Sequence, residues 1–355
     1  MPANGITITG TAQWEAWQSR TLPPVELIAP GVYSIPVVFP GNPMRYTLSY
    51  VLLDGDECVV VDPGFDSDEG YSQLMSALAR LDVGRADISG IVATHFHTDH
   101  LGMAARLARG SGAWIALGQQ EQRHISAFED AHEESALDCD RMRTWGVPDG
   151  RVAEAAMSPE GLHGMRLLAD PDRRLGDGDT LSVAGRNWRI METPGHTPGH
   201  ICLWDDAGEL VLSGDHVLPR ISPNVSLEIR GDTDPLRHNI ESLQRIAGND
   251  HYEVCPAHEY RFRGVGLRAR VLEHYIAERS REVLEVLGNG AATVHEVALQ
   301  LTWSRGWDSL GALQFRLALS ETAAHIRYLA TSGLHPGVPG LSTVASRKYG
   351  ARLRL

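Results

Sequence analysis

The 355-residue sequence has no apolar run long enough to cross a bilayer, which requires about 20 consecutive residues. Residues 1–20 also lack the basic and apolar stretches of a secretory signal. Only four cysteines occur, and no two of them form a CxxC pair (Cys58, Cys139, Cys202 and Cys255). This spacing excludes a CxxC redox or zinc motif. We therefore expect a reduced, cytoplasmic protein that does not associate with membranes.

Positive charge is also scarce. The chain carries 32 Lys and Arg against 45 Asp and Glu, a formal net charge of −13. This balance opposes nucleic-acid binding by the molecule as a whole and favours solubility. Hydrophobic residues make up 43% of the chain, and 36 residues are glycine, which is typical of a globular α/β protein. The length allows one large domain and a smaller one.

The first part of the chain alternates strand and helix patterns. Short β-rich stretches form a predicted hairpin that turns at Asp54–Gly55. Helical spacing then alternates with buried-strand composition, which indicates an α/β layered protein. The predicted helices are 71–81 and 100–110, and the predicted strands are 88–95 and 113–118.

Two later regions are mainly helical in pattern. Residues 119–165 are polar with helical spacing and look like an insert, after which strands return from about 178. The spacing predicts three helices in the final part, at 268–287, 293–302 and about 320–332. We predict a catalytic domain over 1–265 and a helical domain, of winged-helix type, over 266–355. The latter carries 11 Lys and Arg against 7 Asp and Glu.

The segment "THFHTDH" (94–100) concentrates potential metal ligands where a predicted strand ends. His95 and His97 are two residues apart, so both rings can turn to one side of the chain, and Asp99 and His100 follow at once. Histidine and aspartate are common ligands of divalent metals. A strand-end loop can distribute four such donors between two neighbouring metals.

Three further donors also follow strands, and the loops of an α/β sheet gather along one edge. They are His196 in "TPGHTPGH", Asp215 in "LSGDH" and His258 in "CPAHEY". The remaining histidines, including His200 and His216, are expected to be ordinary solvent-exposed or hydrogen-bonded side chains. Asp62 in "VVVDPG" is by itself typical of a turn.

The motifs HxHxDH, TPGHTPGH, SGDH and PAHEY, in this order and spacing, resemble those of the metallo-β-lactamase superfamily over about residues 25–262. The resemblance implies an αββα sandwich with a metal site at one edge. It assigns His95, His97 and His196 to a first metal and Asp99, His100 and His258 to a second, with Asp215 as the bridge. Asp62 matches a position that supports the metal site from behind the ligands.

The resemblance also implies a reaction. Two zinc ions, with iron or manganese as alternatives, lie about 3.5–4 Å apart in such sites and lower the pKa of a shared water toward about 7. The hydroxide attacks a carbonyl or phosphorus, and Asp99 is expected to hold it in line. Asp99 and Asp62 are therefore our candidate catalytic residues.

The motifs indicate the chemistry better than the substrate. "CPAHEY" is similar to the final motif of the hydroxyacylglutathione hydrolases (glyoxalase II), which cleave a thioester, although their glutathione-binding tail is not recognisable. We predict a hydrolase of acyl-CoA or acyl-carrier thioesters or esters. The helical tail also resembles the lactamase-like-2 branch, so a phosphodiesterase or ribonuclease is an alternative, as is an iron-dependent sulfur dioxygenase. A nucleic-acid-binding regulator with a structural metal is disfavoured by the complete ligand set.

Substrate contacts are predicted from position in the chain. The insert would lie over the site as a lid, where Trp145, Met142 and Phe128 either line an acyl pocket or pack the insert itself. Met44 and Tyr46 lie in a loop that often borders the site in relatives. Arg220 is either a contact for an anionic substrate group or a surface residue.

The C-terminal region is expected to cover the active site or to form a homodimer contact. Nucleic-acid binding by this region is the alternative, and its small excess of positive charge supports it only weakly.

Overall fold

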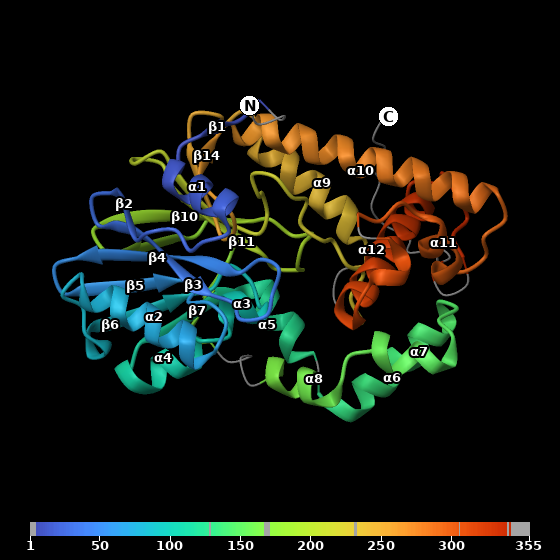
Figure 1. Cartoon of the computed structure of the whole chain (residues 1–355), viewed down its shortest axis with the longest axis horizontal. Helices are drawn as coiled ribbons and strands as arrows, with labels where there is room; N and C mark the ends of the chain where they lie inside the picture. Colours follow the sequence, from blue (N-terminus) through green and yellow to red (C-terminus); the bar gives the residue numbers. More distant parts are fainter. Residues whose placement is uncertain are drawn as a thin grey trace.

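The computed structural model describes residues 5–127, 129–166, 171–230, 233–304, 306–338 and 341. The molecule has a β-sandwich lobe and a helical lobe, and the long helix α10 runs from one to the other (Figure 1). None of the described helices is long and apolar enough to cross a membrane.

The sandwich consists of two seven-stranded sheets. In spatial order, the first sheet contains β1 (Thr7–Ile8), β14 (Phe262–Arg263), β13 (Glu253–Pro256), β12 (Leu210–Gly214), β11 (Ile201–Asp205), β10 (Arg186–Glu192) and β9 (Thr180–Val183). The second contains β2 (Glu26–Ala29), β3 (Val32–Val38), β4 (Tyr46–Asp54), β5 (Glu57–Val61), β6 (Ile88–Val92), β7 (Trp114–Gly118) and β8 (Arg173–Leu175).

Helices cover the outer face of each sheet. Buried residues between the sheets, such as Leu48, Trp188 and Leu203, form the inner core. The helices are α1 (Thr11–Ser19), α2 (Asp68–Ala79), α3 (Thr98–Leu101), α4 (Ala104–Ser111), α5 (Gln119–Ser126), α6 (Ala131–Thr144), α7 (Asp149–Ala155), α8 (Pro159–Arg166), α9 (Pro235–Ile246), α10 (Val265–Gly288), α11 (Val294–Gln300) and α12 (Ala312–Thr331). Helices α2 and α4 pack on one sheet and α9 and α10 on the other, which confirms the αββα sandwich.

The predicted helical insert and C-terminal helices share one core. Buried Trp145 of the insert packs in the same cluster as Val283, Val297 and Phe315 from α10, α11 and α12. Helix α10 begins at the predicted domain boundary, but this cluster joins segments from both sides of it. No strand, and so no wing of a winged helix, occurs among the described residues after β14.

The predicted helix at 100–110 is instead two helices, α3 and α4. The carbonyl of Asp99 accepts a hydrogen bond from the hydroxyl of Thr47 (2.9 Å), and the N–H of Met103 donates to the carbonyl of Gly64 (3.0 Å). A continuous helix would pair the Asp99 carbonyl with the Met103 N–H. Long-range partners therefore replace that helical bond and break the helix directly after the ligand loop.

Candidate metal centre

Seven donor residues from four loops converge at one edge of the sandwich. They fall into three overlapping groups in which the ligand atoms all lie within 4.8 Å of one another. The first group is His95, His97 and His196, and the second is Asp99, His100 and His258. A third group, His95, His100 and Asp215, overlaps both sides of the site. The four segments each follow a strand, so the two sheets deliver them to the same edge.

The first group is a compact imidazole triad. Nδ1 of His97 lies 3.0 Å from Nε2 of His95 and 3.1 Å from Nε2 of His196. Burial is the largest cause that lowers the pKa of each ring, and it brings His97 to about 3 with help from His196. The three rings are therefore neutral near pH 7, which leaves lone pairs free for a metal.

Asp215 lies between this triad and the second group. Its Oδ2 is 3.6 Å from Nε2 of both His100 and His196, and its Oδ1 is 3.4 Å from Nε2 of His258. Asp99 closes the second group, with Oδ2 3.4 Å from Nε2 of His258. This arrangement places one carboxylate where it can bridge two cations.

In the second group, the positive charge of the histidines is balanced by the carboxylates of Asp99 and the neighbouring Asp215. Burial alone would lower the pKa of His100 and His258, but Asp215 and other carboxylates outweigh it and raise both, to about 10 for His258. Burial would raise the pKa of Asp99 and Asp215, and the histidines instead hold both well below their usual range. A bound cation would displace the protons of these histidines.

The donor set fits a pair of divalent cations. Nε2 of His100 and Oδ1 of Asp215 are buried, and within the described part of the chain neither has a hydrogen-bond partner. Such orphaned polar atoms are costly unless a ligand satisfies them. Imidazole and carboxylate donors suit zinc, manganese and iron alike, so the residues fit the predicted cofactor without selecting the element.

Asp62 supports the site from behind the ligands. Its Oδ1 accepts the Thr94 N–H (2.7 Å), and its Oδ2 accepts the Thr94 hydroxyl (2.8 Å) and lies 3.0 Å from Nδ1 of His100. A proton on Nδ1 of His100 leaves Nε2 free to bind a metal. Asp62 adopts a left-handed conformation (φ 52°), which is uncommon for a residue other than glycine.

Other supporting residues were missed by the sequence analysis. The backbone carbonyl of Asn224 accepts a hydrogen bond from Nδ1 of His196 (2.7 Å), and the backbone carbonyl of Tyr46 accepts one from Nδ1 of His258 (3.1 Å). His200, expected to be an ordinary histidine, is fully buried, and its Nε2 accepts the N–H of Asp215 (3.1 Å). Backbone carbonyls leave no residue-type pattern, whereas the second histidine of "TPGHTPGH" was visible in the sequence.

Two glycines allow the ligand loops to approach so closely. Gly214 has a φ of 49°, and a Cβ there would lie 2.6 Å from both Nε2 of His200 and Oγ1 of Thr94. Gly195 has a φ of 142°, and a Cβ there would lie 2.4 Å from Cβ of Asn239. Each glycine directly precedes a donor, so its lack of a side chain sets the donor's position.

A family model described as the metallo-beta-lactamase superfamily matches residues 43–258, which include all seven donors. The chain belongs to the metallo-beta-lactamase superfamily. Among curated proteins it is similar to a probable metallo-hydrolase, YqjP, of Bacillus subtilis (strain 168). The two are 28% identical over 291 residues, 78% of this chain and 86% of that protein. It is also 25% identical to a hydroxyacylglutathione hydrolase of Salmonella arizonae over 244 residues, 66% of this chain and 72% of that protein.

Solved structures extend the likeness beyond the family model. A metallo-beta-lactamase family protein from Thermus thermophilus matches with a TM-score of 0.74 and 26% identity over 88% of this chain and 98% of that one. A beta-lactamase domain protein from Burkholderia ambifaria has the same fold, with a TM-score of 0.70 and 24% identity over 92% of this chain and 94% of that one. These shares of the chain are larger than the region of the family model, so the likeness is not confined to that region.

A pocket of about 550 Å³ opens directly above the donors. His97, Asp99, His196, Asp215 and His258 form its floor. Its walls come from the β3–β4 loop, the loop after β12, the α7–α8 connection and helix α12, and they are mostly apolar. Their apolar residues include Phe39, Met44, Met157, Leu218, Leu313 and Leu317.

Of the predicted substrate contacts, some line the pocket of this metallo-beta-lactamase fold and others are buried elsewhere. Met44 lines the pocket, whereas Tyr46 is fully buried and supports His258. Trp145 and Met142 are buried in the helical core and are not among the residues that line the pocket, so they pack the insert. Phe128 lies outside the described residues.

Arg220 is half exposed and pairs with Glu259, the neighbour of His258 (2.8 Å). Its guanidinium lies 5.3 Å from the Trp17 ring, and that of Arg45 lies 4.2 Å from the same ring. Arg220 does not line the pocket; it belongs to a cationic and aromatic cluster formed by Trp17, Arg45 and Arg220.

Proposed function

We propose that this metallo-beta-lactamase superfamily member is a dinuclear zinc hydrolase that cleaves a thioester or ester with an apolar acyl group. The observation that carries the proposal is the bridging position of Asp215 between two histidine groups on the floor of an apolar pocket. The superfamily and the His/Asp cluster support a metal-dependent hydrolase. The thioester bond is supported by the similarity to hydroxyacylglutathione hydrolases.

The residues on the pocket floor have separate roles in this proposal. When bound, two divalent ions supply a Lewis acid and lower the pKa of water toward about 7. His95, His97 and His196 would hold one ion, and His100, His258 and Asp99 the other. The Asp99 carboxylate faces the pocket and can accept a hydrogen bond from the attacking water, which orients it toward the acyl carbon.

The pocket walls favour an acyl substrate over a phosphodiester. Among the described residues that line the pocket, Arg316 is the only Lys or Arg, and its Nη1 already donates to Asp138 (2.6 Å). A nucleic-acid site needs several cations that are free to contact phosphates. An apolar acyl chain instead gains free energy by leaving water for these walls.

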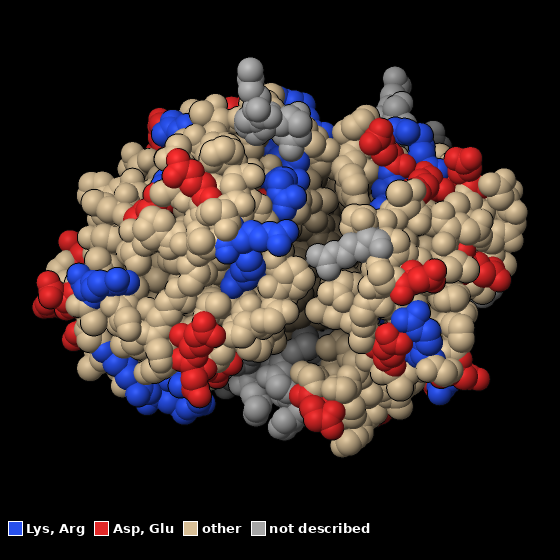
Figure 2. Space-filling view, viewed as in Figure 1, with Lys and Arg blue, Asp and Glu red and all other residues tan. Residues whose placement is uncertain are grey.

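The surroundings of the pocket suit an anionic carrier on the leaving group. The molecule is hollowed between the two lobes, and basic side chains form a row along the sandwich side of the hollow (Figure 2). Arginine guanidinium groups bind phosphates through paired N–H donors. We therefore propose acyl-CoA or another phosphate-bearing acyl carrier as the substrate class.

A hydrolysis screen of the zinc-loaded protein tests the proposal. The panel contains acyl-CoA esters of increasing chain length, p-nitrophenyl esters, a lactone, a β-lactam and bis-p-nitrophenyl phosphate, with metal content measured on the same sample. We expect two metals per chain and the highest kcat/KM with an acyl thioester or ester. Turnover confined to the phosphodiester would refute the proposal, as would one metal per chain at saturation.

A further inference from the structure

Asn224 connects helix α12 to the proposed ligand His196. Its backbone oxygen accepts a hydrogen bond from Nδ1 of His196 (2.7 Å). Its side-chain Nδ2 donates to Oε2 of Glu321 on α12 (2.9 Å). One residue thus contacts a proposed metal ligand of the sandwich lobe and a carboxylate of the helical lobe.

The orientation of the Asn224 amide is determined by its partners. Nδ2 faces the carboxylate of Glu321 and, at 3.5 Å, the carbonyl of Leu317, and both groups only accept hydrogen bonds when Glu321 is ionised. Oδ1 accepts from the hydroxyl of Ser226 (2.5 Å). Exchanging the two amide atoms would put an oxygen against two acceptors, so the bond to the ionised form of Glu321 requires the Asn224 NH₂ group.

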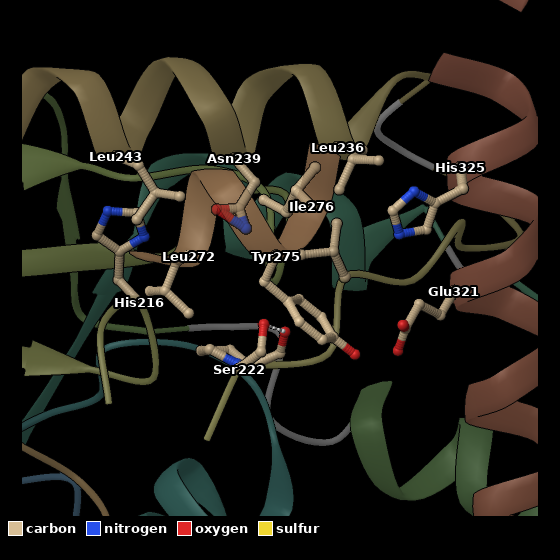
Figure 3. Close-up of a pocket in the computed structure, with 12 residues that line it drawn as sticks. His216, Ser222, Leu236, Asn239, Leu243, Leu272, Tyr275, Ile276, Glu321 and His325 are labelled. Carbon is tan, nitrogen blue, oxygen red and sulfur yellow. Dashed lines mark hydrogen bonds between the residues drawn. The ribbon is translucent and has the colours of Figure 1, made fainter. Parts of the chain in front are cut away.

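Glu321 is itself held in place. It projects from α12 toward a small cavity of about 20 Å³, on the same side of the helix as His325 and facing Ser222 and Tyr275 (Figure 3). Its Oε1 lies 4.0 Å from Nε of Arg279 on α10. Helix α12 is anchored by buried residues such as Phe315 and Leu319. Packing of α12 therefore sets the position from which the Glu321 side chain meets Asn224.

We propose that Glu321 is a positioning residue for the metal centre: through Asn224 it holds His196 with Nδ1 protonated and Nε2 directed at the metal. This inference rests on the metal centre of the proposed function, but not on which bond that centre cleaves. The hydrogen bond at one ring nitrogen determines which nitrogen of a histidine can bind a metal. The docking of the helical lobe would therefore contribute to metal affinity.

Exchanging the two side chains tests the connection. Asn224→Asp places two carboxylates against each other and should lower the affinity for one of the two zinc ions by about tenfold, the lower end of the range for supporting residues of metal sites. Glu321→Gln keeps an acceptor oxygen for Asn224 and should remain within about threefold of wild type, well below that range. In Asn224→Asp with Glu321→Gln the amide donates in the reverse direction, which should restore most of the lost affinity.

Zinc affinity is measured on the metal-free proteins by competition with a chromophoric chelator, so the result does not depend on any hydrolysis assay. Leu329→Ala is the matched control, because Leu329 is buried in the helical core and has no contact with Asn224 among those described. It should lower Tm and leave zinc affinity unchanged. Wild-type affinity in Asn224→Asp would overturn the proposal, as would no recovery in the double variant or an equal loss of affinity in Leu329→Ala.

Discussion

Glu121 gives this fold a pH-dependent stability that one substitution should remove. The residue lies at the start of α5 and is fully buried, and burial raises the pKa of its carboxyl from about 4.5 to about 8. Hydrogen bonds from the Thr197 hydroxyl and the Gly199 N–H, which oppose this rise, do not offset it, and the charge of Glu228 adds to it. Oε2 of Glu121 has no partner among the described residues, so a proton there costs no existing hydrogen bond.

A carboxyl group with a higher pKa in the folded than in the unfolded protein binds its proton more tightly when folded. Its contribution to stability is then complete below about pH 4.5 and is lost as the pH rises to about 8. Over this range the free energy of unfolding falls by about 1.4 kcal/mol per pH unit. Between about pH 5.5 and pH 8 wild type should therefore lose on the order of 3 kcal/mol that Glu121→Gln, which cannot ionise, retains.

Urea unfolding of the metal-free proteins, followed by circular dichroism at several pH values, measures this difference. The free energy of unfolding of Glu121→Gln relative to wild type should rise with pH up to about 8 and then level off. Glu121→Ala should show the same slope with a constant offset, because it removes both the charge and the packing. A difference between Glu121→Gln and wild type that does not vary with pH would refute the reasoning.

Three further predictions concern the proposed active site. Asp62→Asn keeps an acceptor for the Thr94 N–H but presents an NH₂ group to His100, so zinc affinity should fall about 10- to 100-fold in a chelator competition. The matched control is Asp205→Asn, which alters another buried carboxylate that accepts a backbone N–H, and it should bind zinc normally. His97→Ala should lose one metal and most activity together, as measured by elemental analysis and turnover; full turnover without that metal would exclude its role. Leu317→Trp narrows the pocket, so the acyl chain with the highest kcat/KM should become shorter. An unchanged preference for chain length would show that α12 does not contact the substrate.

Residue spacing in the sequence was sufficient to predict elements whose structure depends on neighbouring residues alone. Alternating and helical spacing predicted the hairpin at Asp54–Gly55 and, among the helices of the sandwich, α2, which lies at Asp68–Ala79 against a predicted 71–81. Helices α1 and α9 were not predicted. The helix expected at 100–110 failed because Thr47 and Gly64, both distant in sequence, take the hydrogen bonds that would have continued it. The last helix begins at Ala312 rather than near 320, and its first turns carry the Leu313 and Leu317 that reach the pocket.

The sequence by itself determined the donor types, because four motifs place histidine and aspartate directly after strands, and a sheet edge gathers such loops. Only the tertiary structure decided what surrounds those donors. In the structure Trp145 packs in the helical core, and the buried Tyr46 accepts a hydrogen bond from His258. Packing of α12 places Glu321 next to Asn224. The Tyr46–His258 contact joins the two sheets across 212 positions, and the Asn224–Glu321 contact joins the two lobes across 97 positions. Their geometry comes from tertiary packing rather than from any local pattern.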